Sequence, residues 1–270
     1  MDDLTLAEAI NMKSQLKQVP VEARPLPDPF HARTGHELIP GVSKVYSNLK
    51  KTEEYAADNK MKLNYKKTKL MIFNPGKAKD FMPRFALGKD ELEVVEETKL
   101  LGVVICSDLS WAANTEYMVK RANRKSWYLR KMKKLGAKQE DLVELYSKQI
   151  RSLLEHAVPV WHPGLTGEER LDIERVQKSA FCVILGGKYT SYRSALKVLK
   201  METLFNRRNK LCTKFAKKSL KHSKFTKWFK PKTKMTVTRQ KPTKFHEVFT
   251  RTERFKKSPI SFLTNILNNQ

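Results

Sequence analysis

The sequence predicts an α+β protein, in which a block of short strands precedes a bundle of helices and a basic tail. Two observations lead to this prediction. Short apolar runs bounded by turn residues dominate before about residue 110, and apolar residues at helical spacing dominate after it. The charge changes at nearly the same place, because residues 1–115 hold 17 basic and 16 acidic side chains and residues 116–270 hold 37 and 12. We therefore expect three parts, namely residues 1–110, 111–221 and 222–270.

The first part has the pattern of a small unit of mixed structure. Residues 4–10 alternate weakly and predict a strand, and the prolines between residues 19 and 41 predict an irregular insertion. Residues 42–58 have apolar side chains at helical spacing and predict a helix. Residues 69–73 predict a short strand that stops at the following Asn-Pro-Gly.

A hairpin is predicted over residues 92–106. Its first strand would contain Leu92, Val94 and Val95, and its second strand would be the apolar run of residues 100–105. With the helix before it, this hairpin completes the first part.

The second part predicts a helical bundle, with helices over residues 115–135 and 139–157, a third helix that ends at Gly186-Gly187, and two more over 191–199 and 202–220. Thr166 and Glu169 form a capping box that opens the third helix, and Gly136 and Gly186 are helix stops. The expected core positions are Met118, Ala122, Leu129 and Met132 in the first helix, Leu142, Tyr146, Ile150, Leu153 and Ala157 in the second, and Ile173, Val176, Ala180 and Ile184 in the third.

The net charge of +26 calls for an anionic partner. Residues 205–257 hold 19 basic and 2 acidic side chains, interleaved with aromatic residues such as Phe225 and Trp228. Phosphate contact combined with base stacking uses this mixture, so nucleic acid is the first expectation and an acidic membrane surface the second. A solubilising tail or a nuclear-localisation stretch is the alternative interpretation.

Several classes of protein are not expected. The longest apolar run, residues 100–106, is too short to cross a bilayer, and the acidic N-terminus has no secretory pattern. The three cysteines are widely spaced, which argues against a disulfide scaffold or a cysteine zinc module. We therefore expect an intracellular protein of the nucleus or cytoplasm, with no transmembrane segment.

An ordered series of short motifs runs through nearly the whole chain. Its members are Asp2-Asp3, Asn64 with Lys67-Thr68, the Lys-Leu-Leu-Gly-Val of residues 99–103, and residues 108–111, 146–151, 154–162, 165–166, 173–178 and 204–208. In this order, the series resembles the reverse transcriptase of LINE-type (non-LTR) retrotransposons, an RNA-directed DNA polymerase. The resemblance runs from the catalytic Asp-Asp motif to beyond the thumb.

The resemblance implies a partial palm over residues 1–110, a thumb over 111–221 and a basic, partly disordered connector over 222–270. Asp2 and Asp3 would be catalytic and would hold Mg²⁺ or Mn²⁺. Lys67 would protonate the departing pyrophosphate, although Lys66 and Lys69 lie close enough to compete for that assignment. In the primer-grip hairpin, Gly102 would let the backbone approach the primer.

The same resemblance implies contacts with nucleic acid, as an RNA template and a DNA primer. The residues expected to make them are Lys99, Gly102, Lys120, Arg121, Arg124, Lys131, Lys134, Arg207 and Arg208. Trp228 is added as the tryptophan of the basic tail, where a ring can stack on a base.

The chain also departs from the family. Met1 stands where the family has an aromatic residue before Asp2, and the upstream fingers, the first half of the palm and a further metal-binding aspartate do not precede it. Because phosphoryl transfer needs carboxylates from two palm strands, we expect a truncated product without polymerase activity on its own. A gene model begun at an internal methionine would look the same.

Two other interpretations stay open. The basic half alone is consistent with a non-catalytic, helical nucleic-acid-binding module. Residues 112–155 also faintly resemble the helical N-terminal region of the eighth AlkB homologue, a tRNA-modifying protein, but no His-x-Asp iron motif accompanies them. Metal binding by His31 and His36 is a minor alternative; His156 and His162 are expected to cap or pack, and Trp111, Trp127 and Trp161 to anchor the core.

Overall fold

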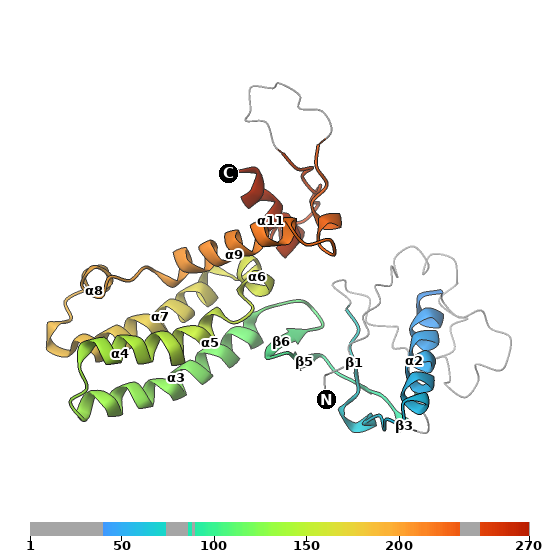
Figure 1. Cartoon of the computed structure of the whole chain (residues 1–270), viewed down its shortest axis with the longest axis horizontal. Helices are drawn as coiled ribbons and strands as arrows, with labels where there is room; N and C mark the ends of the chain where they lie inside the picture. The colour runs from blue at the N-terminus through green and yellow to red at the C-terminus, as the bar shows by residue number, and fades with distance from the viewer. Residues whose placement is uncertain (1–39, 74–85, 88–89, 233–243, 270) are drawn as a thin grey trace, which may run out of the picture. The chain divides into compact units, whose positions relative to one another are not determined.

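The computed structural model describes residues 40–73, 86–87, 90–232 and 244–269 (Figure 1). The chain divides into two compact units, Met1–Leu109 and Ser110–Gln270. Within the described ranges the protein is mostly helical, and all of its paired strands lie in the first unit, in keeping with the predicted α+β class. The strand predicted over 4–10 and residues 19–39 of the proline-rich insertion lie outside the described residues. The insertion was expected to reach residue 41, but Pro40 and Gly41 are the first residues of a helix.

The first unit combines one helix with short strand pairs. Helix α2, Pro40–Asp58, confirms the helix predicted over 42–58, and Ala56 is its buried contact. Strand β1, Lys69–Leu70, pairs in parallel with β4, Glu93–Val94, so the strand predicted over 69–73 is confirmed only at its start. Strands β2, Ala86–Leu87, and β3, Asp90–Glu91, pair antiparallel.

The predicted hairpin exists, but its turn lies inside the apolar run that was expected to be one strand. Strand β5, Glu97–Leu100, pairs antiparallel with β6, Val103–Cys106. Leu101 and Gly102 between them have φ values of 47° and 86°. Two successive residues with positive φ match the right-handed twist of the flanking strands, and Gly102 adopts this conformation without steric cost. Leu101 is 75% exposed, so it leaves the core face despite its apolar character.

The second unit is a bundle of helices that pack side by side (Figure 1). Helix α3, Ala112–Lys134, packs against α7, Gly167–Leu185, and α7 packs against α9, Leu204–Leu220. The expected core positions of α7 are all buried, as are Met118, Ala122 and Leu129 of α3. Met132 is 42% exposed, and the prediction that it lies in the core is wrong, because every residue from 130 to 136 is exposed at the end of α3.

The helix predicted over 139–157 is instead three segments. They are α4, Gln139–Leu145, a π-helical stretch, Tyr146–Arg151, and α5, Ser152–Glu155. Ala157 has φ 51°, and a new short helix, α6, Val158–Trp161, starts with Pro159 in its first turn. A proline is tolerated there because its missing N–H would have had no partner within the helix. Leu142, Tyr146 and Ile150 are buried as predicted, whereas Leu153 and Ala157 are half-buried.

The capping box of α7 is confirmed. The Glu169 N–H donates to Thr166 Oγ1 at 3.3 Å, and the Thr166 N–H donates to Glu169 Oε2 at 2.6 Å. Gly186, at φ 56°, ends the helix, and Gly136, at φ 80°, follows the end of α3. The short helix α8, Tyr192–Val198, lies within the predicted 191–199.

The end of the chain is folded onto the bundle. Two helices, α10, Glu253–Lys256, and α11, Pro259–Asn268, follow the basic segment, and α11 packs against α9. Leu263 and Leu267 of α11 are buried. The tail was expected to be basic and partly disordered, and the prediction did not include this last helix, whose apolar side packs on the bundle.

Candidate nucleic-acid interface

Helix α3 carries a line of cationic side chains on the side that faces away from the core. Met118, Ala122 and Leu129 bury its inner side. Side chains three or four residues apart lie above one another on a helix, so one such series runs along the opposite side. The exposed members of this series, named here the α3 row, are Lys120, Arg124, Trp127, Lys131 and Lys134.

The length of the α3 row can be compared with the spacing of phosphates along a nucleic-acid strand. It extends for about 21 Å from Lys120 to Lys134 at the helical rise of about 1.5 Å per residue. That length matches about six steps of one strand of a duplex at about 3.4 Å each. Trp127 is 54% exposed within the row, so the prediction that it anchors the core is wrong.

The surroundings of the α3 row add positive charge. The 23 residues of α3 contain a single carboxylate, Glu116, which pairs with Lys120 at 2.5 Å on the exposed surface. Arg121 lies over the Tyr117 ring at 5.3 Å, and this stacking orients its guanidinium along the helix. The exposed ion pair contributes little, because solvent screens it, so α3 presents a positive surface.

Arg208 cannot contact nucleic acid in this structure. It lies on the buried face of α9 between Leu204 and Cys212, with none of its surface exposed. Its Nε donates to Nδ1 of His162 at 3.2 Å, and burial lowers the pKa of Arg208 to about 10. The prediction that Arg208 binds nucleic acid is therefore wrong, because its guanidinium is part of the core.

Arg207, the neighbouring predicted contact, is partly exposed and pairs with Glu155 of α5. Glu155 also lies 3.7 Å from Arg151, so one carboxylate balances two guanidinium groups. The pair uses Nε of Arg207, and the side chain stays partly exposed.

His162 is a buried, neutral member of the core, as the packing interpretation predicted. Its Nε2 lies 2.9 Å from Oδ1 of Asn209, and its Nδ1 accepts from Arg208. Burial, with the charges of Arg208 and Arg170, lowers the pKa of His162 to about 4, although the Asn209 hydrogen bond acts in the opposite direction. Because Nδ1 accepts, the Nε2–H donates to Asn209.

Sequence reasoning missed a polar network at the centre of the bundle. Tyr146 donates to Gln177 Oε1 at 2.5 Å, and Gln177 Nε2 donates to the Tyr192 hydroxyl at 2.7 Å and to the Glu202 carbonyl at 3.0 Å. Tyr192 in turn donates to Glu174. Burial raises the pKa of Tyr192, so its hydroxyl keeps its proton. The network connects α7 to its neighbours and stabilises the fold. In the sequence, the position of the polar Gln177 one turn after Ile173, on the apolar side of the helix, could have indicated it.

The first unit brings together the Asn64, Lys67 and Thr68 motif. The Lys67 N–H lies 3.0 Å from the Asn64 carbonyl and 3.2 Å from its Oδ1, and Thr68 Oγ1 donates to the same carbonyl at 3.1 Å. Asn64 thus organises one turn from which the exposed Lys67 side chain extends. Lys69, one of the lysines that compete with Lys67 for the catalytic assignment, instead pairs with Glu93 of β4.

The other predicted residues of the first unit are placed in part. Lys99 is exposed on β5, and Gly102 lies in the turn of the same hairpin. Asp2 and Asp3 lie outside the described residues, so their roles and the Mg²⁺ or Mn²⁺ expectation stay predictions. Among the residues that the structure describes, no group of three or more His, Cys, Asp or Glu is placed to hold a metal ion.

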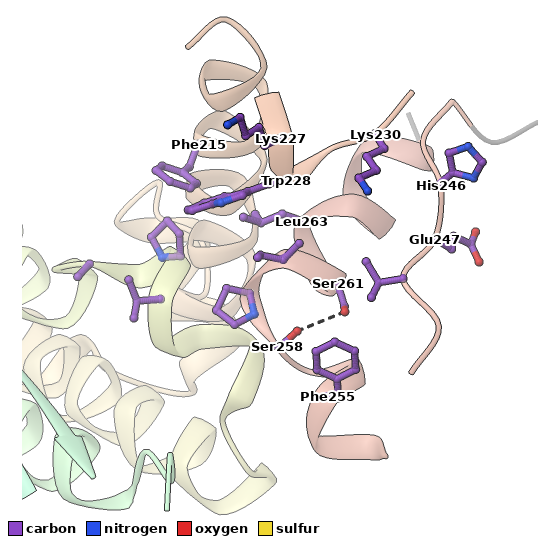
Figure 2. A pocket seen from close by; sticks show the side chains of 16 residues that line it. Phe215, Lys227, Trp228, Lys230, His246, Glu247, Phe255, Ser258, Ser261 and Leu263 are labelled. Carbon is purple, nitrogen blue, oxygen red and sulfur yellow. Dashed lines mark hydrogen bonds between the residues drawn. The ribbon is translucent and has the colours of Figure 1, made fainter. Parts of the chain in front are cut away.

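Trp228 lies at the edge of an apolar groove in the second unit (Figure 2). It is 40% exposed, and its ring lies 4.7 Å from that of Phe225. The ring is accessible at the surface, and its role in base stacking stays a prediction.

Comparison of the chain with protein-family models, with curated proteins and with solved structures gave no match. No helix in the described part of the chain is both long and apolar enough to cross a membrane.

Proposed function

We propose that this chain is the palm end and thumb of a LINE-type reverse transcriptase, and that its second unit holds template–primer nucleic acid through the α3 row. The observation that carries this proposal is the row itself, with four exposed cations and one exposed indole ring aligned on a helix whose opposite side is buried. Such an arrangement binds the phosphate backbone without reading its sequence. The proposal assigns nucleic-acid binding to the chain, and not polymerisation on its own.

The ordered motif series and the Asn64 turn support the reverse-transcriptase part of the proposal. In a chain extended by the fingers and palm of a related element, Asp2→Ala should abolish primer extension, because a metal ligand is lost. Lys67→Ala should slow extension less. Extension at the wild-type rate by the Asp2 variant would refute the metal-ligand assignment.

The interface is tested by neutralising the α3 row. A variant with Lys120→Gln, Arg124→Gln, Lys131→Gln and Lys134→Gln is compared with wild type for binding of a fluorescent RNA–DNA hybrid between about 50 and 200 mM salt. The slope of log affinity against log salt should become shallower by about 3 to 4, since each phosphate contact contributes about 0.9.

A matched control removes the same charge elsewhere on the second unit. Lys178, Lys188, Arg193 and Lys197 are exposed on α7, on α8 and between them. Their replacement by glutamine should change the salt slope by less than one. Equal slopes for the two variants would show that the bound strand does not lie on α3. A flat salt dependence of the wild type would exclude nucleic acid altogether and point to a protein partner.

The non-catalytic module is the second candidate, and the same α3 row favours it. It predicts the same salt slopes but no primer extension by the extended chain, so the two assays together separate the two functions.

A further inference from the structure

The second unit carries an apolar groove of about 990 Å³, bounded by α6, α9, α11 and the segments between α9 and α11 (Figure 2). Aromatic rings lie at its ends. Trp228 and Phe215 stand at one end and Phe255 at the other, with Leu263 of α11 between them (Figure 2). Phe255 is 46% exposed, so both ends offer ring surface to a ligand.

The Trp228 ring packs against a second aromatic ring. Phe225 lies 4.7 Å from it, and Phe215 lies 6.3 Å from Phe225. Because Phe215 belongs to α9, the ring of Phe225 connects the indole to that helix. A rigid aromatic surface at a groove edge is the type of platform on which nucleic-acid bases stack.

The opposite wall of the groove is held in place by hydrogen bonds. The His246 N–H donates to the Lys230 carbonyl at 2.9 Å, which joins two antiparallel segments. Asn268 of α11 fastens the second segment twice, since its Oδ1 accepts from the Phe245 N–H at 2.9 Å and its Nδ2 donates to the Phe245 carbonyl at 3.2 Å. The wall is therefore attached to the bundle through α11.

The rim of the groove is cationic. Lys227 and Lys230 line it and are exposed, and His246 and a single carboxylate, Glu247, lie beside Lys230 (Figure 2). An apolar, ring-lined groove with lysines on its rim is complementary to a ligand that joins flat rings to phosphates. Inside a duplex each base is covered on both sides by its neighbours, so away from the duplex ends a base must be unpaired to place its face on Trp228.

We propose that this groove binds an unpaired base of a single-stranded nucleic acid, with the base stacked on Trp228 and the adjoining phosphates at Lys227 and Lys230. The inference rests on the proposed nucleic-acid-binding function, and adds that the chain distinguishes single strands from duplexes by two separate surfaces. The four cations of the α3 row contact backbone phosphates, whereas the groove contacts a base.

The experiment compares two single-stranded DNA probes of about ten nucleotides, a length in the range of single-strand binding sites. One probe carries bases and the other is abasic throughout, so both carry the same phosphates. The wild-type full chain should bind the base-bearing probe about 5- to 100-fold more tightly, which corresponds to the stacking of one base.

Variants of the full chain locate this preference. Trp228→Ala should remove the preference and leave the affinity for the abasic probe and for an RNA–DNA hybrid within about 2-fold, whereas Trp228→Phe should keep most of it. Lys227→Gln with Lys230→Gln should weaken both single-stranded probes equally, because phosphate contacts are lost.

Three results would overturn the inference: equal wild-type affinity for the two probes, an undiminished preference in Trp228→Ala, or a loss of affinity in Trp228→Ala that is the same for both probes. Each of these results would favour an acidic, apolar segment of a protein as the ligand of the groove. None of them bears on the α3 row, which is tested with a different ligand and variant, so failure of the groove and failure of the proposed function are distinguishable.

Discussion

Acidification should destabilise the second unit through His162. The imidazole is 2% exposed, its Nδ1 accepts from the Arg208 guanidinium, and Arg170 adds a further positive charge nearby. Protonation would remove the acceptor and place a third positive charge in a buried site. Burial first, and then these two cations, lower the pKa of His162 from 6.5 to about 4 in the folded chain.

The direction and size of the effect follow from proton linkage. Between the unfolded pKa of 6.5 and the folded value of about 4, the unfolded chain binds a proton that the folded chain does not, so stability falls as the pH falls through this window. The loss is about 2 kcal/mol by about pH 5 and levels off near about 3 kcal/mol below about pH 4.

Tryptophan fluorescence during urea unfolding measures this loss, because all 4 tryptophans lie in the second unit. The control is His162→Gln, whose amide keeps one donor and one acceptor and does not titrate. The wild type should lose about 2 kcal/mol more than this variant between about pH 7 and pH 5. A difference below about 0.5 kcal/mol would show that the folded state accepts the proton, and the buried, neutral assignment of His162 would be wrong.

Three further predictions concern local structure. Thr166→Ala should lower the free energy of unfolding of the second unit by about 1 kcal/mol and Thr166→Ser should restore it, because the capping box is lost and regained. Ile173→Ala should cost about 2 to 5 kcal/mol, since its side chain is fully buried, whereas Leu171→Ala, 57% exposed on the same helix, should stay within about 0.5 kcal/mol in the same urea assay. Leu101→Asn should stabilise the β5–β6 hairpin by about 1 kcal/mol, visible as slower amide exchange of both strands, because asparagine accepts positive φ more readily than leucine; unchanged exchange would contradict the strained turn.

The helices of the second unit were predictable because local signals and the apolar period agree there. In α7 the capping box, four apolar positions and a terminal glycine all indicate the same element, and the structure confirms each of them. Helix α3 was predicted equally well, but which of its apolar and aromatic side chains are buried was not. Met132 and Trp127 look like core residues by type, and only the packing of α3 against α7 decides that both are exposed.

Arg208 shows where reasoning from residue type failed. It was grouped with the cationic surface because of its charge, yet it follows Leu204 by one helical turn and precedes Cys212 by another, and both of these neighbours are buried. The helical spacing of the apolar residues would have placed Arg208 on the inner face of α9. The pairing of His162 and Asn209 around it is not local in sequence, so no pattern along the chain could have predicted it.

Helix α11 was missed for a different reason. Charge averaged over residues 205–257 was extended to the end of the chain, although Ser258 and Pro259 carry the start signal of a helix and apolar residues follow. The groove depends on that helix, because α11 supplies both Leu263 and the Asn268 clamp. Because α11 was not predicted, the walls of the groove beside Trp228 were not predicted either.

The net charge of the basic half sets how strongly it attracts a polyanion, but not what it can distinguish. Arg208 is buried, Arg207 is paired with Glu155, and Lys133 donates to the Ile184 carbonyl at 2.9 Å, so part of that charge serves the fold. The cations that remain exposed on α3 can contact only phosphates. Discrimination between single and double strands must then come from a surface that takes a base face, and within the described part of the chain the groove at Trp228 combines exposed ring surface with a cationic rim.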